Sequence, residues 1–248
     1  MTTPPTGFPA TADAWLVPGR CRVLAIGRAS ASAAVRLRRA GCEVTLVEKD
    51  PAALASLEGR LGDVSVLAGS ADALPLRPAG FDVVLIHQGL HLVAPGLALA
   101  EFARVLAPGG RLALAYTTRD DSVPWVRRLA RILQSFDPEL MTGRDVASVA
   151  ALDGCGYFPE VENRDFRMWV PVSRDEMLAM VRRSPRLAGL PHAESVRLES
   201  LVAEVYDSSA RQPEPLALPY AVQCWRAEVC QDEFTSRLID VDGLRITL

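Results

Sequence analysis

Two residues have the chemistry and spacing expected of a crevice that binds a nucleoside. Gly27 follows the apolar run Arg22–Ile26, and Glu48 follows the run Glu43–Val47. Glu48 lies about 20 residues past the first loop, at the distance where a carboxylate can accept both ribose hydroxyls. A glycine after the first strand lets the backbone approach the ligand closely. The alternative for Glu48 is a solvent-exposed side chain ahead of the next helix.

The loop after the first apolar run is poor in glycine. The segment Ala25-Ile-Gly27-Arg-Ala29-Ser-Ala31 keeps one glycine. It meets the dinucleotide fingerprint Gly-x-Gly-x-x-Gly only at Gly27, since Ala29 and Ser32 take the other glycine positions. This argues against a nicotinamide-dependent dehydrogenase. A left-handed conformation costs a residue other than glycine roughly 1–2 kcal/mol, so the small alanines predict a tighter loop.

Two histidines follow a later apolar run, Phe81–Ile86. His91 is the candidate general base for a substrate group that must lose a proton. Its alternative is a histidine hydrogen-bonded to nearby backbone. His87 and His91 are four residues apart, but they lie on a strand-to-loop junction with no third ligand nearby, so no metal site is predicted.

A second group of polar and aromatic residues follows the run Arg111–Thr117. Arg119 and Trp125 are predicted to line the pocket that binds the second substrate, the acceptor of a transferred group. Arg119 suits a carboxylate through bidentate hydrogen bonding. Alternatively, Arg119 and Asp120 pair with each other and pin the loop.

Alternating strands and helices are predicted to position these residues. Asp50 is a candidate N-cap with Pro51 at the first helical position. Nearly continuous apolar strands that alternate with helices predict a doubly wound α/β fold, in which ligands bind at the carboxyl ends of the strands. The predicted strands are 22–26, 43–47, 64–67, 81–86 and 111–117, with helices at 31–40, from Asp50, and at 96–106, and a turn at 107–110.

The second half of the chain predicts two long strands with helices between them. Helix 124–136 comes first, and strands at 158–170 and 216–229 flank helices at 173–182 and 193–208. Ser173-Arg-Asp-Glu176 is a capping box. This pattern predicts a β-hairpin edge with a helical insertion that covers the substrate. The predicted divisions are a flexible arm 1–20, a cofactor-binding core 21–150, C-terminal strands with their insertion 151–230, and a tail 231–248.

Residues 22–125 resemble the class I S-adenosylmethionine-dependent methyltransferases. The resemblance rests on Val23-Leu-Ala-Ile-Gly27, Val44-Thr-Leu-Val-Glu48, Gly69-Ser-Ala-Asp-Ala-Leu-Pro-Leu76 with Phe81-Asp82, and Glu101-Phe-Ala-Arg-Val-Leu-Ala-Pro-Gly-Gly110. Gln88-Gly-Leu-His91 and Thr118-Arg-Asp-Asp-Ser-Val-Pro-Trp125 resemble the methyltransferase type 11 and trans-aconitate methyltransferase-like group. The resemblance implies a mostly parallel seven-stranded Rossmann-like sheet and methyl transfer from S-adenosylmethionine to O, N or C of a small molecule.

The resemblance also implies a set of cofactor-binding residues. Asp72 or Ser70 would accept from the adenine amino group, although Asp72 could simply cap its own turn. His87 and Gln88 lie where the family's backbone meets the methionine moiety. The full implied set is Gly27, Arg28, Ala29, Glu48, Lys49, Ser70, Ala71, Asp72, His87 and Gln88.

The first motif departs from the family pattern. Ala25 replaces the acidic residue that helps to hold the cofactor's ammonium group, and Arg28 adds a cation. A like charge at close range weakens binding, and every ~1.4 kcal/mol is tenfold in affinity. Alternatively, Arg28 pairs with the methionine carboxylate. The second functional hypothesis is therefore a non-catalytic methyltransferase-like protein that binds another ligand or a partner.

Composition indicates a globular protein with little cationic surface. The formal net charge is −3, which gives no footprint for nucleic acid or anionic membrane. The five cysteines form no CxxC pair, which favours reduced, buried thiols in a cytoplasmic protein. A monomer or homodimer that acts on a small molecule is expected.

Overall fold

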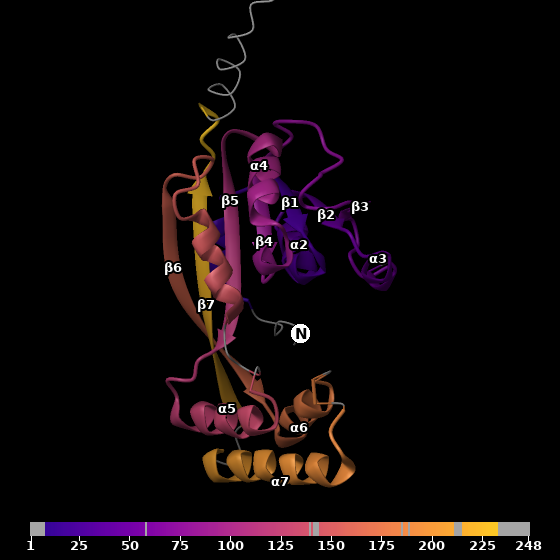
Figure 1. Cartoon of the computed structure of the whole chain (residues 1–248), viewed down its shortest axis with the longest axis vertical. Helices are drawn as coiled ribbons and strands as arrows, with labels where there is room; N and C mark the ends of the chain where they lie inside the picture. Colours follow the sequence, from indigo (N-terminus) through magenta and orange to yellow (C-terminus); the bar gives the residue numbers. More distant parts are fainter. Residues whose placement is uncertain are drawn as a thin grey trace, which may run out of the picture. The chain divides into compact units, whose positions relative to one another are not determined.

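The computed structural model describes residues 8–57, 59–138, 140, 144–184, 186–187, 189–210 and 215–232. The chain divides into two compact units (Figure 1). Among the described residues, the core unit lies within 10–116, 145–164 and 223–232. The helical unit lies within 8–9, 117–144 and 165–222. The predicted tail 231–248 falls outside the described residues from position 233 onward.

A parallel sheet forms the centre of the core unit. Its strands β1 (Arg22–Ile26), β2 (Glu43–Glu48), β3 (Ser65–Ala68) and β4 (Phe81–His87) lie in the order β3-β2-β1-β4. All of the pairings are parallel, and β5 (Leu106–Arg119) adds a further parallel strand beside β4. The central strands are buried because their side chains are apolar on both faces. The predicted doubly wound α/β fold is confirmed.

Two late strands complete a seven-stranded sheet of order β3-β2-β1-β4-β5-β7-β6. They are β6 (Val161–Val172) and β7 (Leu216–Glu228). The Val229 N–H donates to Gly110 O at 2.9 Å, and the Asp120 N–H donates to Pro219 O at 3.1 Å. Residue numbers therefore increase along β5 in the direction in which they decrease along β7, so these two strands are antiparallel. The predicted mostly parallel sheet with a late hairpin is confirmed.

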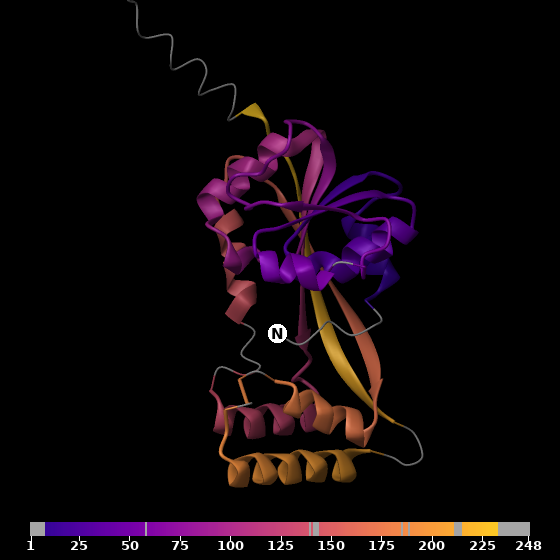
Figure 2. The same cartoon turned by 90° about the vertical axis from the view of Figure 1, so that its right-hand side faces the viewer.

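Helices cover both faces of the sheet in the core unit. These are α2 (Ala31–Arg39), α3 (Pro51–Leu57) and α4 (Pro95–Val105). Figure 2 shows α2 on one face and α4 on the other. The buried side of α4 packs against β4 and β5 together with Leu152 and Phe158. Leu152 belongs to the 3₁₀ segment η3 (Arg144–Leu152), which the sequence did not predict.

The start of the chain differs from the predicted flexible arm 1–20. Helix α1 spans Ala10–Leu16 and buries Ala12 and Leu16. Asp13 forms an ion pair with Arg36 at 2.8 Å. These partners come from distant parts of the sequence, so the short Pro- and Thr-rich segment gave no local signal. Residues 1–7 of the predicted arm lie outside the described residues.

The predicted turn at 107–110 is part of β5. Phe81 pairs with Leu106, whereas Val83 pairs with Arg111, so the extra residues form an irregularity within the β4–β5 ladder. Gly109 has φ 74°, and a Cβ on Gly110 would lie 2.8 Å from Ala107 O. The two glycines therefore let the chain join the ladder directly after α4, where a free turn was expected.

The helical unit has a hydrophobic core of its own. Its helices are α5 (Pro124–Phe136), α6 (Arg174–Arg182) and α7 (His192–Ser209). Apolar side chains of all three helices, with Leu216 and Leu218 of β7, form one buried cluster. The predicted capping box is confirmed, because Ser173 and Glu176 exchange hydrogen bonds at the start of α6. The predicted helical insertion near the hairpin is therefore present.

Candidate functional site

The carboxyl ends of three neighbouring strands meet at one edge of the core sheet. Ile26 of β1 is in register with Val47 of β2 and with Ile86 of β4. The next residues are therefore Gly27, Glu48 and His87, on adjacent strands. In a doubly wound sheet this edge is where ligands bind. The structure thus brings together three of the residues that the sequence singled out.

Gly27 has a backbone conformation that essentially only glycine adopts. Its φ is 76° and its ψ is 155°. The Gly27 N–H donates to Val47 O at 2.8 Å, which fixes the loop to β2. A Cβ on Gly27 would meet no protein atom within 4 Å. The backbone is therefore open on the side where a side chain would otherwise stand.

The Glu48 carboxylate holds the loops on either side of it. The residue is 8% exposed, which excludes the solvent-exposed alternative. One oxygen accepts from the Arg28 N–H at 2.6 Å, and the other accepts from the Asp50 N–H at 2.9 Å. Since a carboxylate oxygen has two acceptor sites, each oxygen retains capacity for a further donor such as a ribose hydroxyl.

Ser30 connects the ends of β1 and β4, a role that the sequence analysis missed. Its hydroxyl donates to Ile26 O at 2.6 Å and accepts from the His87 N–H at 3.0 Å. Ser30 is fully buried, in the 3₁₀ turn η1 (Arg28–Ser30). This serine therefore holds the loop of Gly27 against β4. A small hydroxyl residue inside the loop was the only available signal, and its partners could not be read locally.

The His87 imidazole is enclosed by the core unit, with 1% exposure. Burial lowers its pKa to about 4, the positive charge of Arg36 acts in the same direction, and a hydrogen bond with the Ala29 backbone opposes them. His87 is therefore neutral at pH 7. Its connections to Ala29 and Ser30 make it a support for the loop.

The segment after β4 carries strain and a tyrosine anchor. Gln88 has φ 53°, which is uncommon for a residue with a side chain, and its N–H donates to Ala115 O at 2.9 Å. The Leu90 N–H donates to the Tyr116 hydroxyl at 3.2 Å, and this hydroxyl also bonds Ser148 at 2.8 Å. His91 is exposed in the following 3₁₀ turn, η2 (Leu90–Leu92). The sequence analysis missed Tyr116.

The turn after β3 is organised by its own side chains. The Ser70 hydroxyl donates to the Asp72 carboxylate, and this bond lowers the pKa of Asp72, with a smaller contribution from Lys49. Ala71 is buried, whereas Asp72 and Lys49 are exposed. The two candidates for the adenine contact, Ser70 and Asp72, are therefore neighbours that bond each other.

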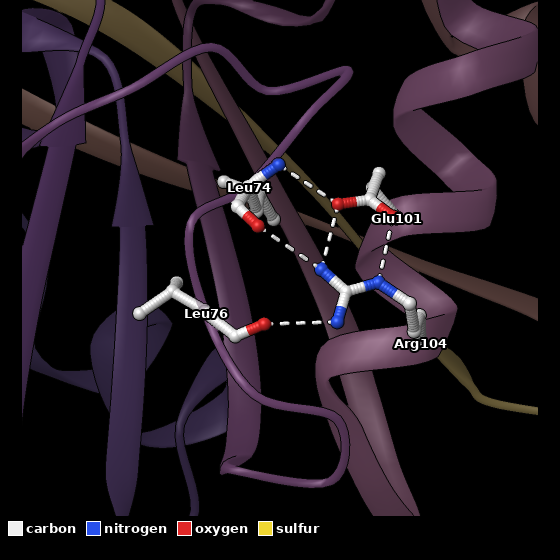
Figure 3. A network of polar contacts seen from close by, with 4 residues as sticks. All are labelled: Leu74, Leu76, Glu101 and Arg104. Atoms are coloured by element: carbon white, nitrogen blue, oxygen red, sulfur yellow. Dashed lines mark hydrogen bonds and ion pairs between the residues drawn. The ribbon is translucent and has the colours of Figure 1, made fainter.

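Two residues of α4 fix the segment that follows this turn (Figure 3). The Leu74 N–H donates to Glu101 at 2.8 Å. Arg104 donates to Leu74 O at 3.1 Å and to Leu76 O at 2.9 Å. Arg104 also forms an ion pair with Glu101 at 2.6 Å and lowers the pKa of that carboxyl. The sequence analysis missed this network, because its partners lie far apart along the chain.

The two predicted acceptor-pocket residues belong to the helical unit. Arg119 is the last residue of β5, and Trp125 packs against the buried cluster from α5. Asp120 accepts from the Ser122 N–H at 3.1 Å and pairs with Arg167 at 3.5 Å. The carboxylate next to Arg119 thus binds other partners, contrary to the alternative in which Arg119 and Asp120 pin the loop together.

Two further observations concern other classes of site. A hollow of about 400 Å³ in the core unit is lined by η3, the start of β6 and Trp225, and includes no predicted site residue. Among the residues that the structure describes, no three or more of His, Cys, Asp and Glu are placed to hold a metal ion. In that same part of the chain, no helix has the length and apolar character needed to cross a membrane.

Comparisons with known proteins agree with this architecture. A family described as a methyltransferase domain matches residues 24–114. An uncharacterised methyltransferase of Mycobacterium tuberculosis is 39% identical over 127 residues, which is 51% of this chain and 52% of the relative. A demethylmenaquinone methyltransferase of Beutenbergia cavernae is 32% identical over 116 residues, 46% of this chain and 48% of the relative. The chain thus matches about half the length of these curated relatives.

The fold comparison covers more of the chain. The solved structure of a putative type II methyltransferase from Anaeromyxobacter dehalogenans is 20% identical, with a TM-score of 0.67 over 89% of this chain and 95% of that one. At this identity the likeness shows the fold alone. Residues 24–114 of this chain therefore match a family described as a methyltransferase domain, and most of the chain shares the fold of a solved methyltransferase-type structure.

Proposed function

We propose that the edge formed by Gly27, Glu48 and Gln88 binds S-adenosylmethionine, and that the chain transfers its methyl group to a small molecule. The observation that carries the proposal is the pairing of open backbone at Gly27 with the buried Glu48 carboxylate. Open backbone gives a ligand close approach, and the carboxylate offers acceptor sites for two hydroxyls. Both features lie at the carboxyl ends of parallel strands.

The residues present fit this cofactor, including at the altered motif. Ala25 has an uncharged methyl side chain that is fully buried in β1, so this position supplies no carboxylate to the edge. The Arg28 side chain is exposed, so solvent and salt screen its charge. The repulsion expected from the sequence is therefore smaller than for a desolvated cation. The Arg28 backbone contributes by donating to Glu48.

The protein's contribution to methyl transfer is positioning. When bound, the cofactor supplies an electrophilic methyl group on a sulfonium. Glu48 and the loop of Gly27 hold and orient the ligand, and Ser30 keeps this loop against β4. His91, in the exposed turn after β4, is the proposed base for an acceptor that must lose a proton. The Beutenbergia relative, named for demethylmenaquinone, supports a small-molecule acceptor.

Ligand titration tests the proposal directly. Isothermal titration and thermal shift with S-adenosylmethionine and S-adenosylhomocysteine should show saturable binding, with a Tm that rises with ligand concentration. NAD serves as the control ligand and should give no shift. The absence of any shift at millimolar S-adenosylmethionine would refute the proposal and favour the non-catalytic hypothesis.

A matched pair of glycine variants tests the location of the site. Gly27→Ala and Gly154→Ala each place a Cβ in open space at a positive φ, 76° and 71°. Both should lower Tm, because a side chain strains such backbone. Only Gly27→Ala should weaken cofactor binding, by tenfold or more, about 1.4 kcal/mol. Equal affinity in both variants would place the cofactor elsewhere.

A further inference from the structure

Cys21 and Cys42 lie side by side at the amino ends of β1 and β2. They directly precede Arg22 and Glu43, which are in-register partners on these parallel strands. The Glu43 N–H donates to Cys21 O at 3.0 Å, so the ladder already aligns the two cysteine backbones. Neighbouring strands are about 4.8 Å apart. Disulfides join residues whose Cα atoms are roughly 4.4–6.8 Å apart.

The two thiols also interact with each other. A side-chain hydrogen bond with Cys42 is among the causes that raise the pKa of Cys21 to about 12, after burial and the charge interaction with Cys42. Cys42 is 1% exposed, and its thiol donates to Gly19 O at 3.4 Å. Cys21 is partly exposed, so one member of the pair is open to a reagent. The strand register and the thiol–thiol hydrogen bond thus both place Cys21 next to Cys42.

A bond between these cysteines would enclose the element that carries the proposed site. The segment from Cys21 to Cys42 comprises β1, the loop of Gly27 and α2. Its ends meet at the edge of the sheet opposite to Gly27. A bridge there would fix both ends of this unit without occupying the ligand edge, and would restrict the unfolded chain.

We propose that Cys21 and Cys42 are a redox-active pair that forms an intramolecular disulfide with a low-molecular-weight disulfide as oxidant. The Cys21 thiolate attacks one sulfur of glutathione disulfide and expels a glutathione thiolate. The Cys42 thiolate then attacks the Cys21 sulfur of this mixed disulfide and expels the second glutathione thiolate. One protein S–S bond forms and the glutathione S–S bond breaks. The two protein thiols lose two electrons and two protons, which leave with the two glutathione molecules.

The environment of Cys21 sets the rate at which the bridge forms. A raised thiol pKa leaves little thiolate at neutral pH, so the bridge forms slowly there and faster at higher pH. The inference does not depend on the proposed methyl transfer, because its test needs no cofactor.

Oxidation of the folded protein tests the pair. The full chain is incubated with oxidised glutathione at about pH 8.5, where more thiol is ionised, then alkylated and analysed by intact mass and tryptic mapping. We expect the oxidised protein to be lighter by two hydrogen atoms before alkylation and to carry two fewer alkyl groups than the reduced control after it, with a cross-linked peptide that joins Cys21-Arg22 to residues 40–49. The oxidised protein should gain roughly 5–10 °C in Tm, and dithiothreitol should remove this gain.

Single-cysteine variants give the control. Cys21→Ser and Cys42→Ala should form no cross-link and gain no Tm, whereas Cys155→Ser, at another partly exposed thiol, should behave as wild type. The wild-type peptide map stands even if Cys42→Ala folds poorly. No cross-link in wild type, a cross-link to another cysteine, or an unchanged Tm after bridging would each overturn the proposal.

Discussion

Replacing Glu48 with glutamine tests the two tasks that its carboxylate can perform, which are fastening the neighbouring loops and holding the ribose. In the structure its oxygens accept from the Arg28 N–H at 2.6 Å and the Asp50 N–H at 2.9 Å. A glutamine keeps one acceptor oxygen, but it turns an NH₂ group toward one of these N–H donors. Glu48→Gln therefore breaks at least one loop contact and also removes the charge that would hold the ribose.

The expected magnitudes follow from these contacts. A hydrogen bond to a charged group contributes about 1.5–3 kcal/mol, and its loss leaves a partly buried donor unsatisfied. For a chain of this size, roughly 2–4 °C of Tm accompanies each kcal/mol, so Glu48→Gln should lower Tm by roughly 3–12 °C. Loss of a charged acceptor for ribose should weaken S-adenosylmethionine binding by about 10- to 100-fold.

Differential scanning calorimetry and isothermal titration measure the two effects separately. Asp82→Asn is the matched control, because Asp82 also accepts from a backbone amide of β1, the Arg22 N–H at 2.8 Å. Asp82 lies at the start of β4, at the amino ends of the strands. Asp82→Asn should therefore lower Tm while the Kd for S-adenosylmethionine stays within about threefold, roughly 0.6 kcal/mol.

The comparison has a clear refuting result. If Glu48→Gln lowers Tm but leaves the Kd as unchanged as Asp82→Asn does, Glu48 only fastens the loop and does not hold the ribose. If the Kd rises while Tm stays constant, the contacts to Arg28 and Asp50 contribute little to folding. In that case the energetic reasoning above is wrong.

Two further predictions concern charge. Arg28→Ala should tighten S-adenosylmethionine binding by about threefold at low salt. This gain in affinity should fade at high salt, because the Arg28 side chain is exposed. Weaker binding in titrations would instead show that Arg28 pairs with the methionine carboxylate. The pKa of His87 falls from 6.5 to about 4 on folding, so the unfolded chain takes up this proton first as pH falls. The free energy of unfolding should therefore decline between pH 6.5 and 4, by about 3 kcal/mol from this group. Urea denaturation of His87→Gln should show a shallower decline with pH than the wild type. Equal declines in the two proteins would contradict the lowered pKa of His87.

The sequence predicted most of the fold because its signals are local. Apolar runs that end in glycine or an acidic residue marked β1 and β2, and the capping box at Ser173 marked the start of α6. These patterns act within a few residues, where backbone preference and periodicity suffice. Gly27 and Glu48 were found for the same reason, since each directly follows a strand.

The same local signals could not supply contacts between distant residues. The sequence left open whether Glu48 was exposed, and only the structure placed its oxygens on the amides of Arg28 and Asp50. Helix α1 escaped prediction because burial against other elements stabilises it. Likewise, no periodicity pairs Tyr116 with Leu90.

The sequence by itself therefore determined the order of strands and helices and the strand ends that carry the proposed site. Tertiary structure alone decided which groups meet there, such as Ser30 with His87, and that Cys21 lies beside Cys42. The physical reason is that strand and helix preferences act between near neighbours. Hydrogen bonds and thiol contacts between remote residues depend instead on how the strands align in the folded sheet.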